Sequence, residues 1–270
     1  MFKGLFIIGS HLRHEYVVES CKNLFEKVFI IKFQREDEIP ILSEEIDNRF
    51  SDLYEKHFLL RHQVENRHFV VNSTDHNSVD TEIIKVQSTS EMHSEYISEL
   101  IKEFNADFCL VFGTQILKAP IIGALPKYTM NLHLGLSPWY RGDATLFWPF
   151  VMLEPQECGI TFHKLASSAD SGDIFHQARP QLEMGDRLHD VGVKCVLLAA
   201  VELQKLILKL KSSGRLSSVK QGNRGKEWLA ADFKPQHLAL VYEIFHDNIV
   251  DWYLKKLESK KRKIIQQDFC

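Results

Sequence analysis

The fold is decided by residues 3–33, which read KGLFIIGSHLRHEYVVESCKNLFEKVFIIKF. The apolar run Lys3–Gly9 predicts a strand that is buried on both faces, and Lys27–Phe33 predicts a second one. Between them, apolar residues recur at helical spacing over Arg13–Glu26, which predicts an amphipathic helix. A strand, a helix and a strand within about 30 residues form a βαβ unit, so this end of the chain is expected to be α/β with a parallel sheet.

The alternation of strands and helices continues along the chain. Further strands are predicted at His68–Asn72, Asp107–Phe112, Tyr128–His133, Gly159–Leu165 and Gly172–Pro180. Helices are predicted at Ser43–Leu60, Glu91–Phe104, beside Pro120, at Ala144–Leu153, at Arg187–Ser212 and, as one helix or two, over Ala239–Lys263. The expected fold class is a Rossmann-like α/β fold with a mixed, mostly parallel sheet, followed by a small, mainly helical C-terminal extension.

The composition is typical of a globular protein, with 44% hydrophobic and 26% charged residues among 270. These values exclude a disordered chain, a collagen-like repeat and a small disulfide scaffold. No stretch approaches the ~18 consecutive apolar residues of a membrane span, and the start is expected to be a strand rather than a signal peptide. The 5 cysteines are odd in number and include no C-x-x-C pair, which favours a reduced, cytoplasmic protein.

Charge divides the chain into two unlike parts. The net charge is −3, yet residues 206–270 hold 13 Lys and Arg against 7 Asp and Glu, whereas the remainder holds 20 against 29. The charge difference is consistent with an α/β domain at 1–205 followed by an extension at 206–270, in which the polar stretch 212–226 is expected to be a linker. The run Lys260–Lys263 is expected to be a solvated helix end, with an RNA or phosphate contact as the alternative. Apolar residues of the last helices could form a homodimer interface or pack on the parent domain.

The residues that suggest chemistry lie between positions 130 and 174. Asn131 and His133 stand two apart at the end of a predicted strand, so their side chains lie on the same side of it. Open α/β sheets bind their ligands at the carboxyl ends of strands. Asp170 follows a later strand and could meet them there to orient the imidazole of His133. The alternative for each is a hydrogen-bonded core or turn residue.

An amide, an imidazole and a carboxylate suit the transfer of an acyl group to an amine. Negative charge develops on the carbonyl oxygen, and one donor such as an Asn amide or a protonated His is worth about 10²–10³ in rate. A general base must also take a proton from the attacking nitrogen, and the leaving nitrogen must receive one. The sequence has no G-x-S-x-G elbow and no motif of metal ligands, so neither a covalent nucleophile nor a catalytic metal is expected.

The same window resembles a known family, the 10-formyltetrahydrofolate-dependent formyltransferases. This superfamily includes the glycinamide ribonucleotide, methionyl-tRNA and nucleotide-sugar N-formyltransferases, and the resemblance covers about residues 1–205. It rests on the Asn-x-His, Pro-x-x-Arg/Lys-Gly, Gly-x-Thr and Asp-x-Gly motifs, which have the family's order and separation. They correspond here to Asn131, His133, Pro138, Arg141, Gly142, Gly159, Thr161, Asp170 and Gly172.

The resemblance implies a sheet of the formyltransferase type and a catalytic centre of Asn131, His133 and Asp170. It implies 10-formyltetrahydrofolate, from one-carbon metabolism, as the formyl-donating cosubstrate. The folate slot would be lined from two loops by Phe112, Gly113, Ile116, Leu117, Ala166, Ser167 and Ser168. Because some relatives hold a substrate phosphate after the first strand, Ser10, His11 and Arg13 are expected to contact the acceptor. Arg141 is expected to bind an anionic acceptor, with bracing of its own loop as the alternative, and Tyr140 is expected to form a stacking surface for the acceptor, with core packing as the alternative. His163 could line the site or pack in the core.

The sequence leaves the acceptor open. A primary amine on a nucleotide-linked amino sugar is favoured, because 65 residues after position 205 are fewer than the C-terminal barrel of methionyl-tRNA formyltransferases contains. Methionyl-tRNA is the alternative acceptor, since a basic extension could steer RNA. Hydrolysis of the formyl donor and non-catalytic folate binding are further alternatives, and no membrane partner is expected.

Overall fold

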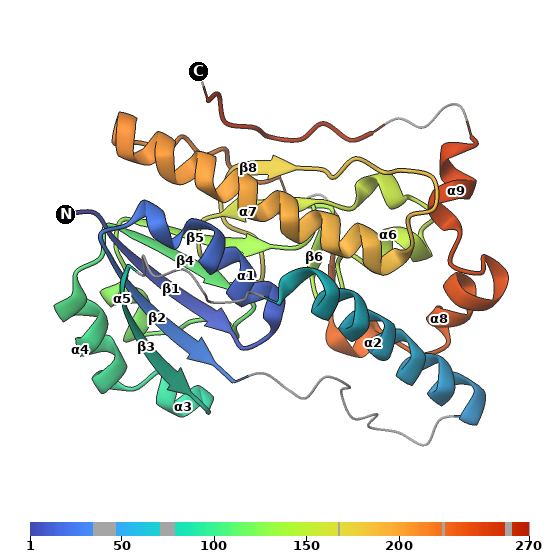
Figure 1. Ribbon diagram of the computed structural model, residues 1–270, viewed down its shortest axis with the longest axis horizontal. Helices are drawn as coiled ribbons and strands as arrows, with labels where there is room; N and C mark the ends of the chain where they lie inside the picture. The colour runs from blue at the N-terminus through green and yellow to red at the C-terminus, as the bar shows by residue number, and fades with distance from the viewer. Residues whose placement is uncertain (35–46, 71–78, 167, 223–224, 257–260, 270) are drawn as a thin grey trace.

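The computed structural model describes residues 1–34, 47–70, 79–166, 168–222, 225–256 and 261–269. Its main strands are β1 (Lys3–Gly9), β2 (Lys27–Phe33), β3 (Asp80–Val86), β4 (Phe108–Phe112), β5 (Tyr128–His133), β7 (Ile160–His163) and β8 (Ile174–Ala178). They form a seven-stranded sheet in the order β3-β2-β1-β4-β5-β7-β8 (Figure 1).

The sheet is mixed and mostly parallel, which confirms the predicted fold class. Strands β1 to β5 pair in parallel, and β7 and β8 extend the sheet from β5 in antiparallel pairing. The chain begins at β1, builds outward to β2 and β3, and then returns to the other side of β1 with β4. Such a reversal of strand order opens a ligand crevice at the carboxyl ends of the neighbouring strands.

Helices cover both faces of this sheet (Figure 1). One face carries α1 (Leu12–Cys21), α2 (Asn48–Phe69) and α7 (Leu188–Ser213), and the other carries α4 (Glu95–Phe104) and α5 (Ile121–Ala124). In β1, Phe6 and Ile8 belong to the core on the α7 side, whereas Leu5 and Ile7 belong to the core on the α4 side. This burial on both faces explains why the strand is apolar throughout.

The remaining elements are short. They are α3 (Thr89–Met92), β6 (Tyr140–Gly142), α6 (Trp148–Val151), β9 (Lys226–Trp228), α8 (His237–Ala239), α9 (Ile249–Leu254), a π-helical turn at Leu240–Ile244, and 3₁₀ turns at Lys22–Leu24, Pro155–Glu157 and Ala230–Asp232. Among the described residues, no helix has both the length and the apolar character that crossing a bilayer requires.

The C-terminal part packs directly on the rest of the molecule. Helix α7 runs through position 205 without a break, and β9 pairs in parallel with β6. Trp228 stacks on Trp148 with ring centroids 4.1 Å apart, and Val250 is fully buried in the same core. The final stretch, 261–269, runs beside β8, where Gln177 N–H donates to the Ile265 carbonyl at 2.6 Å.

Three predictions of secondary structure are wrong. The strand expected at His68–Asn72 begins inside α2, which continues to Phe69, while residues 71 and 72 lie outside the described ranges. The third strand is instead β3, whose side chains are largely exposed at the sheet edge and therefore lack an apolar pattern. The helix expected at Ala144–Leu153 is reduced to α6. The one or two helices expected over Ala239–Lys263 are reduced to a π-helical turn and α9, which ends at Leu254, while residues 257–260 lie outside the described ranges. Short turns with local hydrogen bonds replace both, so apolar spacing alone overestimated their length.

Candidate active site

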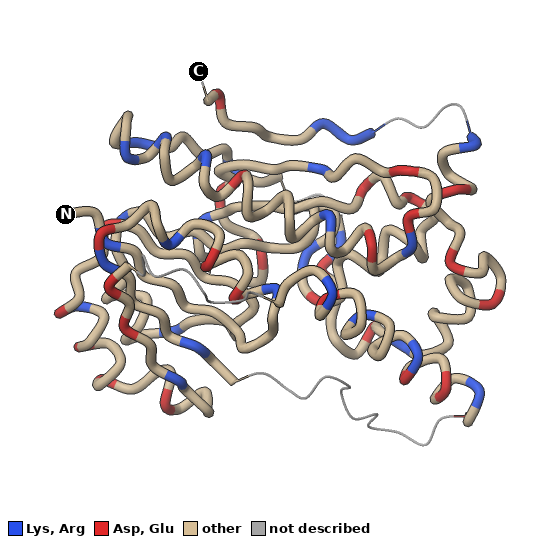
Figure 2. The backbone as a smooth tube through the Cα atoms, in the orientation of Figure 1, with Lys and Arg blue, Asp and Glu red and all other residues tan. Residues whose placement is uncertain are grey.

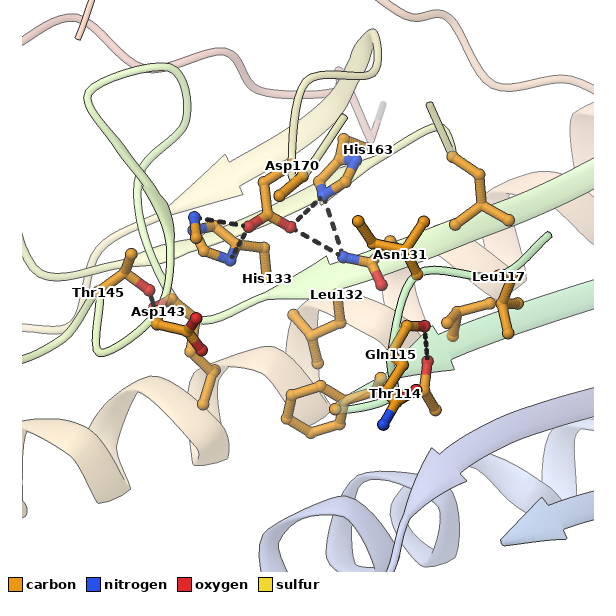
Figure 3. Close-up of a pocket in the computed structure, with 18 of the residues that line it drawn as sticks. Thr114, Gln115, Leu117, Asn131, Leu132, His133, Asp143, Thr145, His163 and Asp170 are labelled. Carbon is orange, nitrogen blue, oxygen red and sulfur yellow. Dashed lines mark hydrogen bonds and ion pairs between the residues drawn. The ribbon is translucent and has the colours of Figure 1, made fainter. Parts of the chain in front are cut away.

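Four polar side chains meet where β5 and β7 end (Figure 3). Asn131 and His133 extend from β5, His163 is the last residue of β7, and Asp170 lies on the loop between β7 and β8. The antiparallel pairing places Asn131 opposite His163. The structure thus brings together the three residues predicted to be catalytic and adds a second imidazole to them.

Asp170 lies at the centre of this cluster. Its Oδ2 is 3.1 Å from His133 Nδ1 and accepts a hydrogen bond from Gly142 N–H at 2.9 Å. Its Oδ1 accepts from Asn131 Nδ2 at 3.3 Å and is 3.2 Å from His163 Nε2. Burial alone would raise the pKa of this carboxyl, but the charge of His133, the contact with His163 and the Gly142 N–H together hold it well below its usual range. Asp170 is therefore a carboxylate at neutral pH.

His133 is buried, and both of its ring nitrogens face acceptors. Its Nδ1 faces Asp170, and its Nε2 lies 2.7 Å from the Tyr140 carbonyl. Burial lowers the pKa of His133 by more than the Asp170 charge and the Tyr140 carbonyl raise it. The ring is therefore mainly neutral at pH 7, with its proton on Nδ1 toward the carboxylate. When it gains a second proton, both acceptors are already in place, which suits a group that takes up and returns a proton.

The amide of Asn131 is held by its two neighbours. One contact of the amide is with His163, whose Nε2 lies 3.0 Å from Asn131 Nδ2 and 3.2 Å from Asp170 Oδ1, and whose Nδ1 lies 2.7 Å from the Lys164 carbonyl. The second amide hydrogen is directed at Asp170, at the longest distance in the cluster, 3.3 Å. A ligand oxygen could take over this weaker hydrogen bond. Asn131 is therefore a candidate donor, and His163 orients it.

The cluster forms one wall of a cavity of about 630 Å³, a size usual for small-molecule sites. The residues predicted to hold folate line this cavity, namely Phe112, Gly113, Ile116, Leu117, Ala166 and Ser168, whereas Ser167 lies outside the described residues. Leu117, Leu132 and Leu165 contribute apolar side chains to the lining, and Thr114, Gln115 and Ser168 contribute polar ones. This lining fits a flat heteroaromatic ring, whose faces are apolar and whose edges form hydrogen bonds.

The residues predicted to bind the acceptor reach the cavity only in part. Arg13 lines it, but Arg13 Nη1 also donates to both carboxylate oxygens of Glu65, at 2.8 and 3.0 Å. Much of its charge is thereby compensated. The described lining of this cavity does not include Ser10, His11, Tyr140 or Arg141.

A second cavity, of about 420 Å³, adjoins the first. The two share Arg13, Leu134, Asp143, Thr145 and Ala230 as lining residues. The other walls of the second cavity are mainly apolar, with aromatic side chains from Tyr54, Phe58, Phe69, Phe147 and Phe233 beside aliphatic ones from α7, and they also include the charged residues Arg61 and Glu65. Two cavities that meet beside the polar cluster give a donor and an acceptor room to meet there.

Two residues of the candidate site, His163 and Asp143, were not assigned to it from the sequence. His163 was left open between the site and the core, because only the antiparallel addition of β7 places it opposite Asn131. Asp143 was not considered, although it directly follows the Gly142 motif. It lines both cavities and helps to raise the pKa of His133. Within the part of the chain that the structure describes, no group of three or more His, Cys, Asp or Glu side chains is arranged to hold a metal ion.

Comparisons with known proteins identify the family of this chain. A sequence model of the formyl transferase family matches residues 55–199. The chain is 32% identical over 141 residues to methionyl-tRNA formyltransferase of Clostridium botulinum, covering 50% of this chain and 43% of that protein. It is 27% identical over 124 residues to GDP-perosamine N-formyltransferase of Brucella melitensis, covering 46% of this chain and 48% of that protein. The match therefore spans less than half the length of these curated relatives.

A solved structure shows the same fold. The N-formyltransferase from Helicobacter canadensis, in complex with folinic acid and dTDP-3-aminofucose, superposes with a TM-score of 0.55 at 18% identity, covering 87% of this chain and 73% of that one. The family model extends from within α2 through β4, β5, β7 and β8 into α7, and so includes the whole polar cluster. Since this match takes in more than half of the residues, the chain belongs to the formyl transferase family.

Proposed function

We propose that this protein is an N-formyltransferase that moves a formyl group from 10-formyltetrahydrofolate to a primary amine of a nucleotide-linked amino sugar. The observation that carries the proposal is the convergence of Asn131, His133 and Asp170 on a cavity lined by both loops expected to hold folate. A protein of the same fold that was solved with folinic acid and a dTDP-linked amino sugar supports the two substrate classes.

In the proposed reaction, the amine nitrogen attacks the formyl carbon, and the bond from that carbon to the folate nitrogen breaks. His133, neutral at the start, takes a proton from the amine on Nε2, which exchanges its contact with the Tyr140 carbonyl for the substrate, and returns that proton to the leaving folate nitrogen, so that protons balance. Asp170 stabilises the imidazolium while it exists. Asn131 and this imidazolium donate hydrogen bonds to the formyl oxygen as the tetrahedral intermediate places negative charge on it.

We place the non-reacting part of the acceptor in the second cavity. Its aromatic walls suit a nucleobase, because stacked rings gain both buried area and favourable ring contacts. Arg61, whose guanidinium lies 4.6 Å from the ring centroid of Phe58, brings a positive charge to the same walls and suits a diphosphate. A nucleotide-linked sugar carries both groups, and its amine would then lie near the junction at Asp143 and Thr145.

A methionyl-tRNA formyltransferase is the second candidate, favoured by the 32% identity over 141 residues. RNA binding draws on a continuous basic surface. Figure 2 instead shows basic and acidic positions interspersed along the chain. In the extension, Arg262 pairs with Glu154 and Glu157, and Lys226 pairs with Asp232. We therefore rank the small acceptor first.

The assay follows release of tetrahydrofolate from 10-formyltetrahydrofolate by the purified full chain. Acceptors are nucleotide-linked 3-amino and 4-amino sugars and methionyl initiator tRNA, with one reaction lacking any acceptor. We expect release that requires an amino sugar, with one formyl group found on its amine by mass spectrometry. Formylation of tRNA alone would favour the second candidate. Release without any acceptor would indicate hydrolysis, and donor binding without release would indicate a folate-binding protein.

A further inference from the structure

The segment after α7 contacts the loop that carries Asp170. Val219 and Ile174 exchange two backbone hydrogen bonds, each 2.8 Å long, which align residues 219–221 beside the start of β8. In this alignment the side chain of Gln221 reaches the preceding turn. Gln221 Nε2 donates to the Asp170 carbonyl at 2.8 Å and to the Gly172 carbonyl at 2.5 Å. One carboxamide nitrogen thus bridges both carbonyls of the turn.

This turn needs external support. Asp170 has a φ of 47°, in the left-handed region that residues other than glycine rarely adopt. Its side chain must also reach four partners at once in order to stay between His133 and Asn131. A primary amide supplies two N–H donors on one planar nitrogen, which matches two neighbouring carbonyls. Gln221 therefore holds the backbone in the conformation that the carboxylate requires.

The same segment also supports the loop on the other side of Asp170. Lys226 N–H donates to the Trp139 carbonyl at 3.3 Å, and Asp143 N–H donates to the Trp228 carbonyl at 2.8 Å. These contacts flank Gly142, whose N–H donates to Asp170 Oδ2. The two loops that meet at Asp170 are thus both attached to residues well beyond position 205.

We propose that Gln221 is a positioning residue that fixes Asp170 against His133. The kinetic consequence rests on the proposed formyl transfer, but the geometric consequence does not. Without the two hydrogen bonds the turn relaxes, and the carboxylate moves away from His133 Nδ1. The groups that face His133 are Asp170, His163, Asp143 and the Tyr140 carbonyl, and of these the Asp170 carboxylate contributes most to keeping a proton on the ring.

The direct test measures the titration of His133 by NMR in the free protein. The variant Gln221→Met keeps a side chain of similar length without donors, and Lys220→Met is the matched control at the exposed neighbouring position. The His133 resonance is assigned by its loss in His133→Gln. We expect the pKa of His133 to fall in Gln221→Met and to stay unchanged in Lys220→Met, because loss of a nearby negative charge disfavours the imidazolium.

A second variant covers the case in which Gln221→Met fails to fold. Gln221→Glu preserves the shape, but its carboxylate repels two carbonyls until it is protonated and can donate once. Its activity relative to wild type should therefore rise as the pH falls. At pH 8 we expect kcat to fall at least about tenfold in both Gln221 variants, because displacements of about 1 Å can lower rates about 10²-fold, while KM for the donor stays within about twofold.

The outcomes separate this inference from the proposed function. An unchanged His133 pKa in a folded Gln221 variant, or an equal fall in Lys220→Met, would overturn the positioning role. An equal loss in kcat, donor binding and melting temperature would show a merely structural role and would also overturn it. If wild type transfers no formyl group to any acceptor, the proposed function fails, and the NMR titration still decides the role of Gln221.

Discussion

The substitution Asp170→Asn removes one buried negative charge and leaves the size of the side chain unchanged. In wild type, one carboxylate oxygen faces His133 and accepts from Gly142 N–H, and the other accepts from Asn131. An amide has a single oxygen, so its NH2 group must replace one of these acceptors. The orientation that keeps the oxygen toward His133 places an N–H donor against the amide nitrogen of Asn131. The substitution therefore weakens both the base and the candidate oxyanion donor.

The expected magnitude follows from the 3.1 Å contact between His133 Nδ1 and Asp170 Oδ2. Two unit charges about 4 Å apart attract each other by about 4 kcal/mol at an effective dielectric constant near 20. The two side chains are 6% and 14% exposed, so solvent screens only part of this attraction. Discounting for that screening, we expect the imidazolium to lose about 2–3 kcal/mol of stabilisation, which corresponds to a decrease in kcat of roughly 30- to 200-fold.

The assay is steady-state tetrahydrofolate release at saturating acceptor, with donor affinity measured separately. The matched control is Asp173→Asn, three residues further along, where the carboxylate pairs with Lys164 in a largely exposed contact of 2.9 Å. Exposed pairs are worth about 0–1 kcal/mol, so the control should retain activity within about fivefold. Donor affinity should stay near that of wild type in both variants, because neither change removes an apolar wall of the cavity.

The pH profile of kcat/KM should also shift in Asp170→Asn, and the direction of that shift tests the role of Asp170. His133 must be neutral to take the proton, and the nearby carboxylate raises its pKa. Loss of that charge lowers the pKa, so the acidic limb of kcat/KM should move to lower pH in Asp170→Asn. A kcat within about threefold of wild type, or an acidic limb that moves to higher pH, would refute the role assigned to Asp170.

Three further predictions follow from the packing. Gly135→Ala would place a methyl group 2.4 Å from His133 Nε2, so kcat should fall at least about tenfold, whereas Gly123→Ala, whose methyl group would meet nothing within 4 Å beyond its own helix and chain neighbours, should leave it unchanged. Burial lowers the pKa of His189 from 6.5 to about 3. Between pH 7 and pH 5, His189 therefore becomes protonated in the unfolded chain but stays neutral in the folded chain. Unfolding in urea should therefore become easier between pH 7 and pH 5, with His189 contributing about 2 kcal/mol beside other buried histidines such as His57, and His189→Gln should remove that contribution. Trp228→Ala removes a buried stacked ring and should lower the unfolding free energy by about 3–5 kcal/mol, measured in the same way.

The strands that were predicted well are those buried on both faces. In β1, β2 and β4, nearly all side chains apart from the lysines are buried among apolar neighbours, so the local pattern is sufficient. Strand β3 was missed because an edge strand places only part of its side chains in the core. The lengths of the last helices were overestimated because their apolar residues reach the core from short turns. Their contacts in the core, rather than the spacing of apolar residues along the chain, determine this conformation.

The sequence by itself determined the α/β class and pointed to the three residues of the candidate centre. Spacing within one strand places Asn131 and His133 on a common side without reference to any other element. Only the tertiary structure decided what completes the site, because the remaining contacts join segments far apart in the chain. His163 comes opposite Asn131 through antiparallel pairing, and Gln221 reaches the turn of Asp170 from beyond the long helix α7. Hydrogen bonds across such distances depend on how whole elements pack, and no local pattern encodes that packing.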